Sequence, residues 1–545
     1  MASSYRNSPV CVLLILLSCC AGCCFGFGTF GFDFHHRYSD PVKGILAVDD
    51  LPKKGSFAYY SALAHRDRYF RLRGRGLAAQ GNDKTPLTFS AGNDTYRLNS
   101  LGLYCYSFAE SYCLMQLDYF FKLWNCNSYA CLHYANISVG RPALSFIVAL
   151  DTGSDLFWLP CDCVSCVHGL NSSSGQVIDF NIYSPNTSST SSKVPCNSTL
   201  CELQKQCPSA GSNCPYQVRY LSDGTMSTGF LVEDVLHLAT DEKQSKSVDS
   251  RISFGCGRVQ TGSFLDGAAP NGLFGLGMDK TSVPSILANQ GLIPNSFSMC
   301  FGSDGTGRIS FGDKGSPGQG ETPFSLRQTH PTYNITITQV SVGGNAANFE
   351  FSAIFDSGTS FTYLNDPAYT QISETFNSLA KEKRETSTSD LPFEYCYVLS
   401  PNQTNFEYPV VNLTMKGGGP FFVNDPIVIV SSEPKGLYLY CLGVVKSDNV
   451  NIIGQNFMTG YNIVFDREKN VLGWKASDCY GVNNSSALPI PPKSSVPPAT
   501  ALNPEATAGG ISPASAPPIG SHSLKLHPLT CALLVMTLIA SFAIF

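Results

Sequence analysis

Short apolar runs broken by glycine, proline, asparagine and serine fill the chain between about residue 86 and residue 480. Apolar runs of this length, bounded by turn-forming residues, are typical of β-strands. A helical spacing of apolar positions is rare and is clearest at residues 366–383. The pattern predicts an all-β body, with strands at SFIVAL (145–150), QVRYL (217–221), ISFGCG (252–257), RISFG (308–312), NIIGQNF (451–457) and YNIVFD (461–466).

A weak internal repeat divides this body. The segments FIVALDTGSDLFWL around residue 151 and FSAIFDSGTSFTYL around residue 356 share one form: an apolar run, Asp, a hydroxyl residue, Gly, a hydroxyl residue and a second apolar run. Each copy has a later partner in which apolar residues precede a glycine, GLFGLG at 272–277 and NIIGQNF at 451–457. Two homologous lobes that each contribute one carboxylate explain the repeat.

Asp151 and Asp356 are the candidate catalytic residues, because a pair of carboxylates can hydrolyse an amide without a metal or a cofactor. One carboxylate activates a water while the other protonates the carbonyl oxygen. Like charges a few ångströms apart cannot both ionise, so the pair retains one proton in mildly acidic solution. Gly153 and Gly358 allow tight turns, and Thr152 and Ser357 can brace the two loops.

The sequences DTGS at 151–154 and DSGT at 356–359 resemble the paired active-site signatures of the pepsin-like aspartic peptidases. Trp158 and the apolar segments ending at Gly275 and Gly454 extend the resemblance over residues 87–480. The cysteine cluster at 161–214 is similar to the extra loop of the plant nepenthesin-type branch. The resemblance implies an all-β, bilobal pepsin-like fold with a cleft between two homologous lobes, and an aspartic-type endopeptidase that acts on polypeptides at acidic pH.

The same resemblance assigns roles to individual side chains. Ser154 and Thr359 are expected to hydrogen-bond the outer oxygens of the two aspartates, and Trp158 is expected beneath a flap. Tyr220 is the expected flap tyrosine, although Leu221 follows it where the family usually has glycine; Tyr216 is the other candidate. The supporting active-site set is therefore Thr152, Gly153, Ser154, Ser357, Gly358 and Thr359, with Tyr220 and Trp158 at the flap.

Residues 103–131 interrupt the resemblance. They join YRLNSLG (96–102) to LHYANISVG (132–140), two segments that resemble the arms of the hairpin opening the N-terminal lobe. The intervening stretch is rich in aromatic residues and cysteine and lacks glycine and proline. It is interpreted as a retained intron or isoform-specific insertion, with a long disulfide-bonded hairpin loop as the alternative.

The two ends of the chain carry targeting patterns. Residues 1–24 have the basic start, apolar core and small-residue end of a signal peptide, and residues 25–86 are a basic segment interpreted as a propeptide whose cations cover an acidic cleft. A buried helix and a solvated helical surface are the respective alternatives. The N-terminal lobe is expected at 87–325 and the C-terminal lobe at 326–480.

Beyond the lobes, residues 481–521 form a Pro-, Ser- and Ala-rich stalk, and residues 522–545 end in an apolar run. That run has no basic flank, so a GPI-attachment signal fits better than a membrane span or a soluble tail, with Ala514 as the candidate attachment residue. Glycosylation sequons suit the secretory pathway and the extracellular face of the plasma membrane, with vacuole or apoplast as alternatives. They stand at Asn93, Asn136, Asn171, Asn186, Asn197, Asn334, Asn402, Asn412, Asn483 and Asn484.

The chain has 22 cysteines, a high number that favours an oxidising compartment. Those between residues 161 and 479 are even in number and compatible with six bridges, of which Cys396–Cys441 and then Cys256–Cys479 are the expected pairs. Cys161, Cys163 and Cys166 could suggest zinc, but without matching histidines a disulfide loop is favoured. No metal and no cofactor are expected.

The formal net charge of −5 and the charged fraction of 14% provide no basic surface for a phosphate backbone, which argues against nucleic acid as a partner. The expected partners are a polypeptide substrate and a membrane reached through the lipid anchor, with the chain itself a monomer. Two other functions stay open: a catalytically inactive peptidase-fold binding protein of the glycosidase-inhibitor kind, and a GPI-anchored adhesion glycoprotein.

Overall fold

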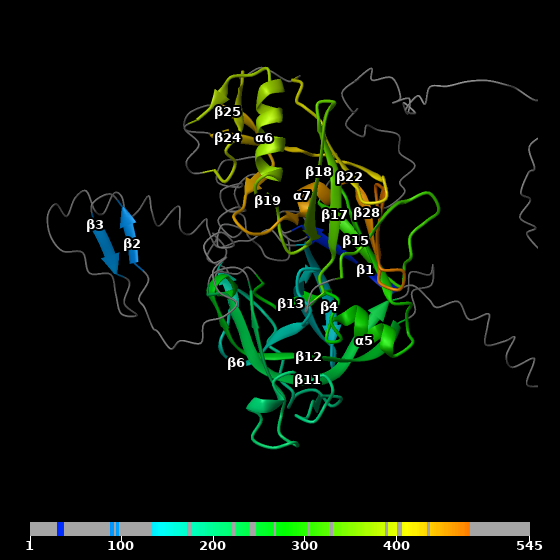
Figure 1. Cartoon of the computed structure of the whole chain (residues 1–545). Helices are drawn as coiled ribbons and strands as arrows, with labels where there is room; N and C mark the ends of the chain where they lie inside the picture. The colour runs from blue at the N-terminus through cyan, green and yellow to red at the C-terminus, as the bar shows by residue number, and fades with distance from the viewer. Residues whose placement is uncertain are drawn as a thin grey trace, which may run out of the picture. The chain divides into compact units, whose positions relative to one another are not determined.

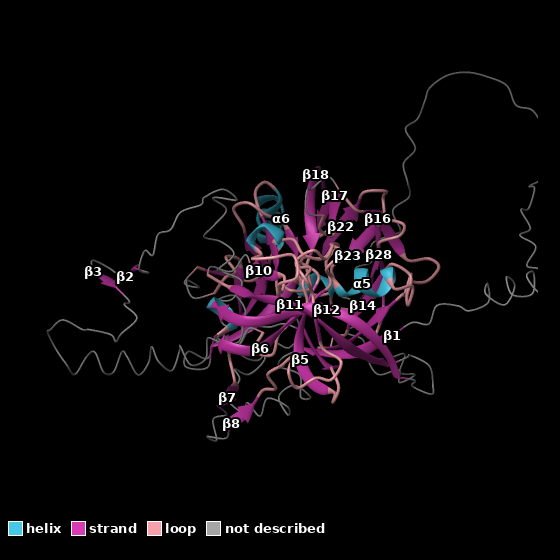
Figure 2. Cartoon of the chain, turned by 90° about the horizontal axis from the view of Figure 1, so that it is seen from below, coloured by secondary structure: helices cyan, strands magenta, loops and turns pink. Residues whose placement is uncertain are grey.

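The computed structural model of the protein describes residues 30–36, 88–91, 94–97, 133–171, 177–220, 224–239, 247–265, 269–303, 305–326, 331–386, 391–400, 406–432 and 437–479. β-strands dominate these residues, as Figures 1 and 2 show. No helix among them is long and apolar enough to cross a membrane. The expected signal peptide, the insertion at 103–131, the stalk and Ala514 lie outside the described residues.

The largest sheet has 14 strands and includes most of the N-terminal lobe. In spatial order its strands are β10 (Pro215–Arg219), β11 (Met226–Ala239), β12 (Ser247–Thr261), β6 (Trp158–Ser165), β13 (Leu273–Gly275), β5 (Leu144–Asp151), β4 (His133–Val139), β1 (Phe30–His36), β15 (Thr306–Phe311), β14 (Ser296–Phe301), β28 (Tyr461–Asp466), β29 (Val471–Ala476) and β16 (Gly320–Pro323), with β9 (Ser192–Lys193) paired to β11.

The C-terminal lobe is built on two further sheets. One has the order β23 (Pro420–Phe422), β22 (Val411–Met415), β17 (Asn334–Val342), β18 (Asn345–Phe355), β27 (Ile452–Ile453), β19 (Thr362–Leu364) and β26 (Val444–Lys446). The other has the order β20 (Arg384–Glu385), β21 (Cys396–Leu399), β25 (Leu437–Leu442) and β24 (Ile427–Ser432). Small hairpins pair β2 (Thr88–Ala91) with β3 (Asp94–Arg97), and β7 (Gly169–Asn171) with β8 (Val177–Asp179).

The helices are short. α6 (Ala368–Leu379) lies within the predicted helical stretch and packs Phe376 against Tyr397 of β21, with ring centroids 5.9 Å apart. The others are α5 (Val283–Asn289), α7 (Gln455–Met458) and the 3-10 turns at Gln204–Gln206 and Gly262–Phe264. Most of the predicted strands are present, but within NIIGQNF only Ile452–Ile453 is a strand, because the chain turns into α7 directly after Gly454.

The two lobes repeat one strand arrangement. In the N-terminal lobe β13 runs parallel to β5 and antiparallel to β6, and in the C-terminal lobe β27 runs parallel to β18 and antiparallel to β19. A fourth strand lies parallel beside each copy, β12 next to β6 and β26 next to β19. The duplicated body predicted from the sequence repeat is therefore present.

Strands from both lobes meet in the large sheet. β14 pairs antiparallel with β28, and across this pair Phe297 stacks on Phe465 with centroids 4.7 Å apart. Both rings are fully buried in a core that extends through the two lobes. This continuous apolar contact joins the two lobes through one shared core.

One strand of that sheet comes from the segment predicted to be a propeptide. β1 lies between β15 and β4, with Phe34 buried and Asp33 bonded to Arg308 at 2.7 Å. The alternation FGFDF, with every second residue apolar, is the sequence signal for this strand. The expected partner of the 132–140 arm was residues 96–102, but β4 pairs with β1, β5 and β11, and Asp94–Arg97 pairs with β2.

Six disulfides use all the cysteines described between residues 161 and 479. Cys396–Cys441 forms as predicted, because these residues face each other in the β21–β25 register. The predicted Cys256–Cys479 bridge is wrong: Cys256 bonds Cys161 across the parallel neighbours β12 and β6, and Cys479 bonds Cys300 of β14. The remaining pairs are Cys163–Cys166, Cys196–Cys207 and Cys201–Cys214.

Candidate functional site

Asp151 is the last residue of β5, and its side chain is 7% exposed. The turn after Asp151 provides two hydrogen-bond donors to its carboxylate. The backbone N–H of Gly153 donates to Oδ1 at 2.9 Å, and the Ser154 hydroxyl donates to Oδ2 at 2.5 Å. The carboxylate is therefore fixed in orientation by its own loop.

Asp356 follows β18 in the other lobe and has the same surroundings. It is 8% exposed. The backbone N–H of Gly358 donates to Oδ1 at 2.7 Å, and the Thr359 hydroxyl donates to Oδ2 at 2.6 Å. Ser154 and Thr359 thus occupy equivalent positions on the Oδ2 oxygens of the two aspartates.

The two loops are tied together between the aspartates. The N–H of Thr152 donates to Ser357 Oγ at 3.0 Å, and the N–H of Ser357 donates to Thr152 Oγ1 at 2.9 Å. Each hydroxyl also donates across to a carbonyl oxygen of the opposite strand, Thr152 to Phe355 at 3.1 Å and Ser357 to Leu150 at 3.2 Å. All four groups are buried, so the mutual position of the loops is set by bonds that water cannot replace.

The carboxylates converge on the two glycines. A Cβ on Gly358 would stand 2.3 Å from Asp151 Oδ1 and 2.9 Å from Asp356 Oδ1. A Cβ on Gly153 would stand 2.7 Å from Asp356 Oδ1. Only glycine leaves room for this approach, because any side chain would overlap a carboxylate oxygen. The residues that the sequence repeat placed at equivalent positions are therefore brought together.

The apolar segments at 272–277 and 451–457 pass behind the loops that carry Asp151 and Asp356, respectively. Leu276 N–H donates to the Asp151 carbonyl oxygen and Gln455 N–H donates to the Thr359 carbonyl oxygen, both at 2.9 Å. A Cβ on Gly275 would lie 2.2 Å from the Asp155 carbonyl oxygen, and one on Gly454 would lie 2.1 Å from that of Phe361. The close contact explains why each segment needs glycine where it passes behind the loop.

Tyr220 follows β10 and lies near the N-terminal-lobe aspartate. Trp158 Nε1 donates to the Tyr220 hydroxyl at 2.8 Å. Burial, and then the charge of Asp151, raise the pKa of Tyr220 well above its ordinary value, so the phenol stays protonated. Tyr216, the other candidate, is a buried residue of β10. Its hydroxyl is bonded to the Ser227 hydroxyl at 2.9 Å.

Two further residues complete the site, and sequence reasoning did not identify them. Phe264 packs edge-on against both Trp158 and Tyr220, with centroids 4.8 and 4.9 Å away. Gln455 is buried and its side-chain amide donates to the Ser357 carbonyl oxygen. The position of Gln455 directly after Gly454 was the available signal, whereas nothing in the sequence around Phe264 places it near Trp158.

Comparisons with known proteins agree with this geometry. The family described as "Xylanase inhibitor N-terminal" matches residues 133–313, and "Xylanase inhibitor C-terminal" matches residues 332–476. "Aspartyl protease family protein 1" of Arabidopsis thaliana is 57% identical over 89% of this chain and 88% of its own length. "Aspartic proteinase nepenthesin-2" of Nepenthes gracilis is 25% identical over 63% of this chain and 77% of its own length.

Among solved structures, "Basic 7S globulin from soybean" matches with a TM-score of 0.50 and 20% identity, over 64% of this chain and 91% of that chain. At this identity the likeness bears on the fold alone. It agrees with a mostly β body of two lobes.

Proposed function

The chain belongs to the pepsin-like aspartyl protease family, and from this premise we propose that it is an active aspartic endopeptidase that uses Asp151 and Asp356. The observation that carries the proposal is the convergence of both Oδ1 atoms on the position of Gly358. Two carboxylates that face one point from two separately supported loops can share one proton and hold one water.

In the proposed reaction the ionised carboxylate takes a proton from the water, which attacks the peptide carbonyl carbon. The protonated carboxylate gives its proton to the carbonyl oxygen, and the carbon becomes tetrahedral. The carboxyl that took the proton from the water then gives it to the nitrogen as the C–N bond breaks. The other carboxylate takes a proton from one hydroxyl of the tetrahedral carbon, which becomes the new carboxyl group, so the pair again holds one proton. The Ser154 and Thr359 hydroxyls support this cycle because each binds an Oδ2 atom and leaves Oδ1 directed at the reaction.

Tyr220 supports the proposal from the N-terminal lobe. Its hydroxyl is anchored by Trp158 and its ring by Phe264, and the carboxylate of Asp151 is near enough to influence its ionisation. A neutral phenol at this position can cover a bound polypeptide and donate a hydrogen bond to it. The tyrosine is proposed as a substrate-covering group rather than as a proton donor in the reaction.

A binding protein without activity is the second candidate, because the matching family descriptions name xylanase inhibitors. Binding a glycosidase does not require two carboxylates that are held by the same set of hydrogen bonds. Here both aspartates, both glycines and the hydroxyl residues beside them are retained with matching hydrogen bonds. This retention favours catalysis over binding alone.

The test is cleavage of an acid-denatured protein by purified, propeptide-processed enzyme between pH 3 and pH 7. We expect cleavage in the acidic part of this range, inhibition by a statine-type transition-state mimic, and loss of about 10³-fold or more in kcat for Asp151→Asn and Asp356→Asn. Binding and inhibition of a xylanase, without peptide cleavage at any pH, would instead establish the inhibitor function.

We further propose that the protein acts in an oxidising, lumenal or extracellular compartment and is attached to the membrane by a lipid anchor. Six disulfides support the compartment. The sequon residues Asn136, Asn186 and Asn197 are exposed and open to glycosylation. Release of the protein from the membranes of cells that express it by a phosphatidylinositol-specific phospholipase tests the anchor, and retention after treatment contradicts it.

A further inference from the structure

The Cys163–Cys166 disulfide differs from the other five in its surroundings. Both of its cysteines are partly exposed, whereas every other bridge has at least one buried cysteine. Val164, between the two, is 78% exposed. The bridge closes a loop of sequence separation 3, and so short a loop adds little to the stability of the folded state. An external thiol can therefore reach this bridge, and the body can remain folded when it opens.

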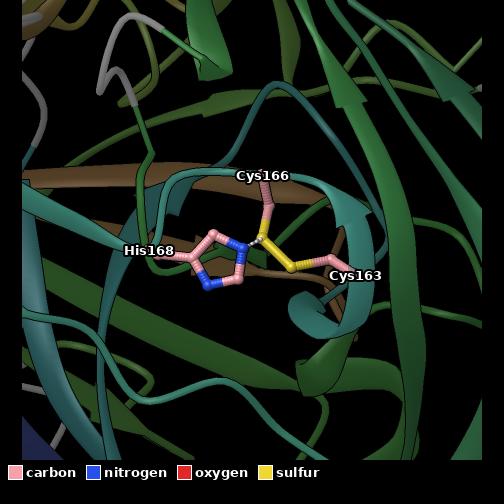
Figure 3. Close-up of side chains that lie close together, drawn as sticks. All are labelled: Cys163, Cys166 and His168. Atoms are coloured by element: carbon pink, nitrogen blue, oxygen red, sulfur yellow. Dashed lines mark hydrogen bonds between the residues drawn. A yellow bond between two sulfur atoms is a disulfide. The ribbon is translucent and has the colours of Figure 1, made fainter.

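A histidine lies beside one of the two sulfurs. Figure 3 shows the His168 ring directed at Cys166, and His168 Nε2 is 3.7 Å from Cys166 Sγ. An imidazolium at this distance stabilises a departing thiolate, and a better leaving thiolate speeds exchange. Attack is therefore directed to Cys163, with Cys166 as the leaving group. The same three side chains could group around a metal, but the disulfide occupies both sulfurs.

A series of hydrogen bonds connects the Cys163–Cys166 loop to the strands beside the candidate flap residue, Tyr220. The Ser165 hydroxyl, between the cysteines, donates to the Gln260 carbonyl oxygen of β12 at 3.1 Å. Gln260 is 2% exposed, and its side-chain amide donates to Ser227 of β11 at 3.5 Å. Ser227 in turn bonds Tyr216 of β10. The contacts lead from the disulfide loop to the β10–β11 hairpin, in which Tyr220 directly follows β10.

We propose that Cys163–Cys166 is a reversible thiol-exchange site, whose reduction loosens the β10–β11 hairpin near its turn. In the first step an external thiolate bonds to Cys163 Sγ, the Cys163–Cys166 bond breaks, and Cys166 leaves as a thiolate. A second external thiol then releases Cys163. The sum is one protein disulfide and two thiols converted to two cysteine thiols and one external disulfide, with the thiol protons passing to the cysteines.

Chemical labelling tests the exchange without reference to peptidase activity. The full chain is incubated with graded ratios of reduced to oxidised glutathione, or with a reduced thioredoxin-type protein, then alkylated and mapped by peptide mass spectrometry. We expect Cys163 and Cys166 to be labelled before any other pair, and the reagent effective at the lower concentration identifies the class of reductant. Opening of Cys196–Cys207 or Cys300–Cys479 at the same or lower thiol concentration overturns the proposal.

His168→Gln tests the role of the imidazole. It should slow opening of the bridge by about tenfold. His237→Gln, a histidine that bonds Asp249 at 2.7 Å and no cysteine, is the matched control and should leave the opening rate unchanged. Equal opening rates in the wild type and His168→Gln contradict the assignment of Cys166 as the assisted leaving group.

The effect on the hairpin rests on the proposed peptidase function. Reduction should raise KM by about threefold or more with little change in kcat, because the hairpin contacts substrate rather than the reacting bond. The double variant Cys163→Ser/Cys166→Ser should have the raised KM and no response to thiols. Ser165→Ala, which keeps the bridge and removes its bond to Gln260, should raise KM as well. An unchanged KM after verified reduction refutes the coupling, while an enzyme inactive before reduction refutes only the peptidase function.

Discussion

Thr152 and Ser357 exchange hydrogen bonds in both directions, each backbone N–H donating to the hydroxyl of the other at 3.0 and 2.9 Å. The residues come from different lobes and both are buried. Each lobe supplies one backbone N–H donor and one hydroxyl acceptor. The exchange therefore fixes the positions of Asp151 and Asp356, which precede these two residues, relative to each other.

Thr152→Val removes this hydroxyl while keeping the shape of the side chain. The N–H of Ser357 is then left without an acceptor, which we expect to lower the free energy of unfolding by about 1–3 kcal/mol. The kcat should fall more than KM changes, because the carboxylates lose their fixed separation. Denaturant unfolding and steady-state kinetics measure both. Thr375→Val, at a half-buried threonine of α6 whose hydroxyl bonds Gln371 one helical turn away, is the control and should change neither by a comparable amount.

Gly358→Ala tests the convergence of the carboxylates. The added Cβ would stand 2.3 Å from Asp151 Oδ1, so either the loop or the carboxylate must move. We expect loss of at least about 10²-fold in kcat/KM from a misplacement of this size. Gly211→Ala is the matched control, since a Cβ there meets nothing within 4 Å. Full activity in Gly358→Ala would show that the two carboxylates do not act together.

Tyr220→Phe tests the flap assignment. The ring can still pack on Phe264, but Trp158 Nε1 loses its acceptor and the position near Asp151 loses its hydroxyl. We expect kcat/KM to fall by about tenfold, with the greater part of the change in KM. Tyr438→Phe, at a tyrosine 45% exposed in the other lobe, should have no effect. If Tyr220→Phe and Tyr438→Phe had equal kinetic constants, the flap residue would have to be one other than Tyr220.

The burial of His133 should make the free energy of unfolding depend on pH. It is 5% exposed, and burial lowers its pKa from 6.5 to about 3. The unfolded chain therefore binds a proton that the folded chain does not, so stability from this residue is complete above pH 6.5 and declines as the pH falls toward 3. At pH 4 the loss amounts to about 3 kcal/mol.

Unfolding by denaturant at pH 7 and pH 4 measures this effect. His133→Gln should reduce the difference between the two pH values, and His168→Gln, at an exposed histidine, should retain the wild-type difference. This bears on the proposed acidic activity, because stability would be lowest where the aspartates are best able to share a proton. A pH difference unaffected by His133→Gln would assign the acid sensitivity to other groups.

The active-site loops illustrate what local sequence can predict. The apolar run, Asp, hydroxyl residue and Gly of each copy predict a strand followed by a tight turn, and the Gly153 and Ser154 bonds to Asp151 are made within that one turn. These features depend on residues close in the chain, or on a repeated motif.

Other features depend on which strands become neighbours. Cys256 bonds Cys161 because β12 lies parallel to β6, and β4 takes β1 as its neighbour although nearly a hundred residues separate them. Phe264 reaches Trp158 in the same way. The sequence by itself determined the β-rich, duplicated character of the chain and the identity of the two aspartates, since hydrophobic period and turn chemistry are local. Only the tertiary structure decided strand neighbours, the disulfide partners other than Cys396–Cys441 and the side chains behind the site, because these depend on the packing of the whole core.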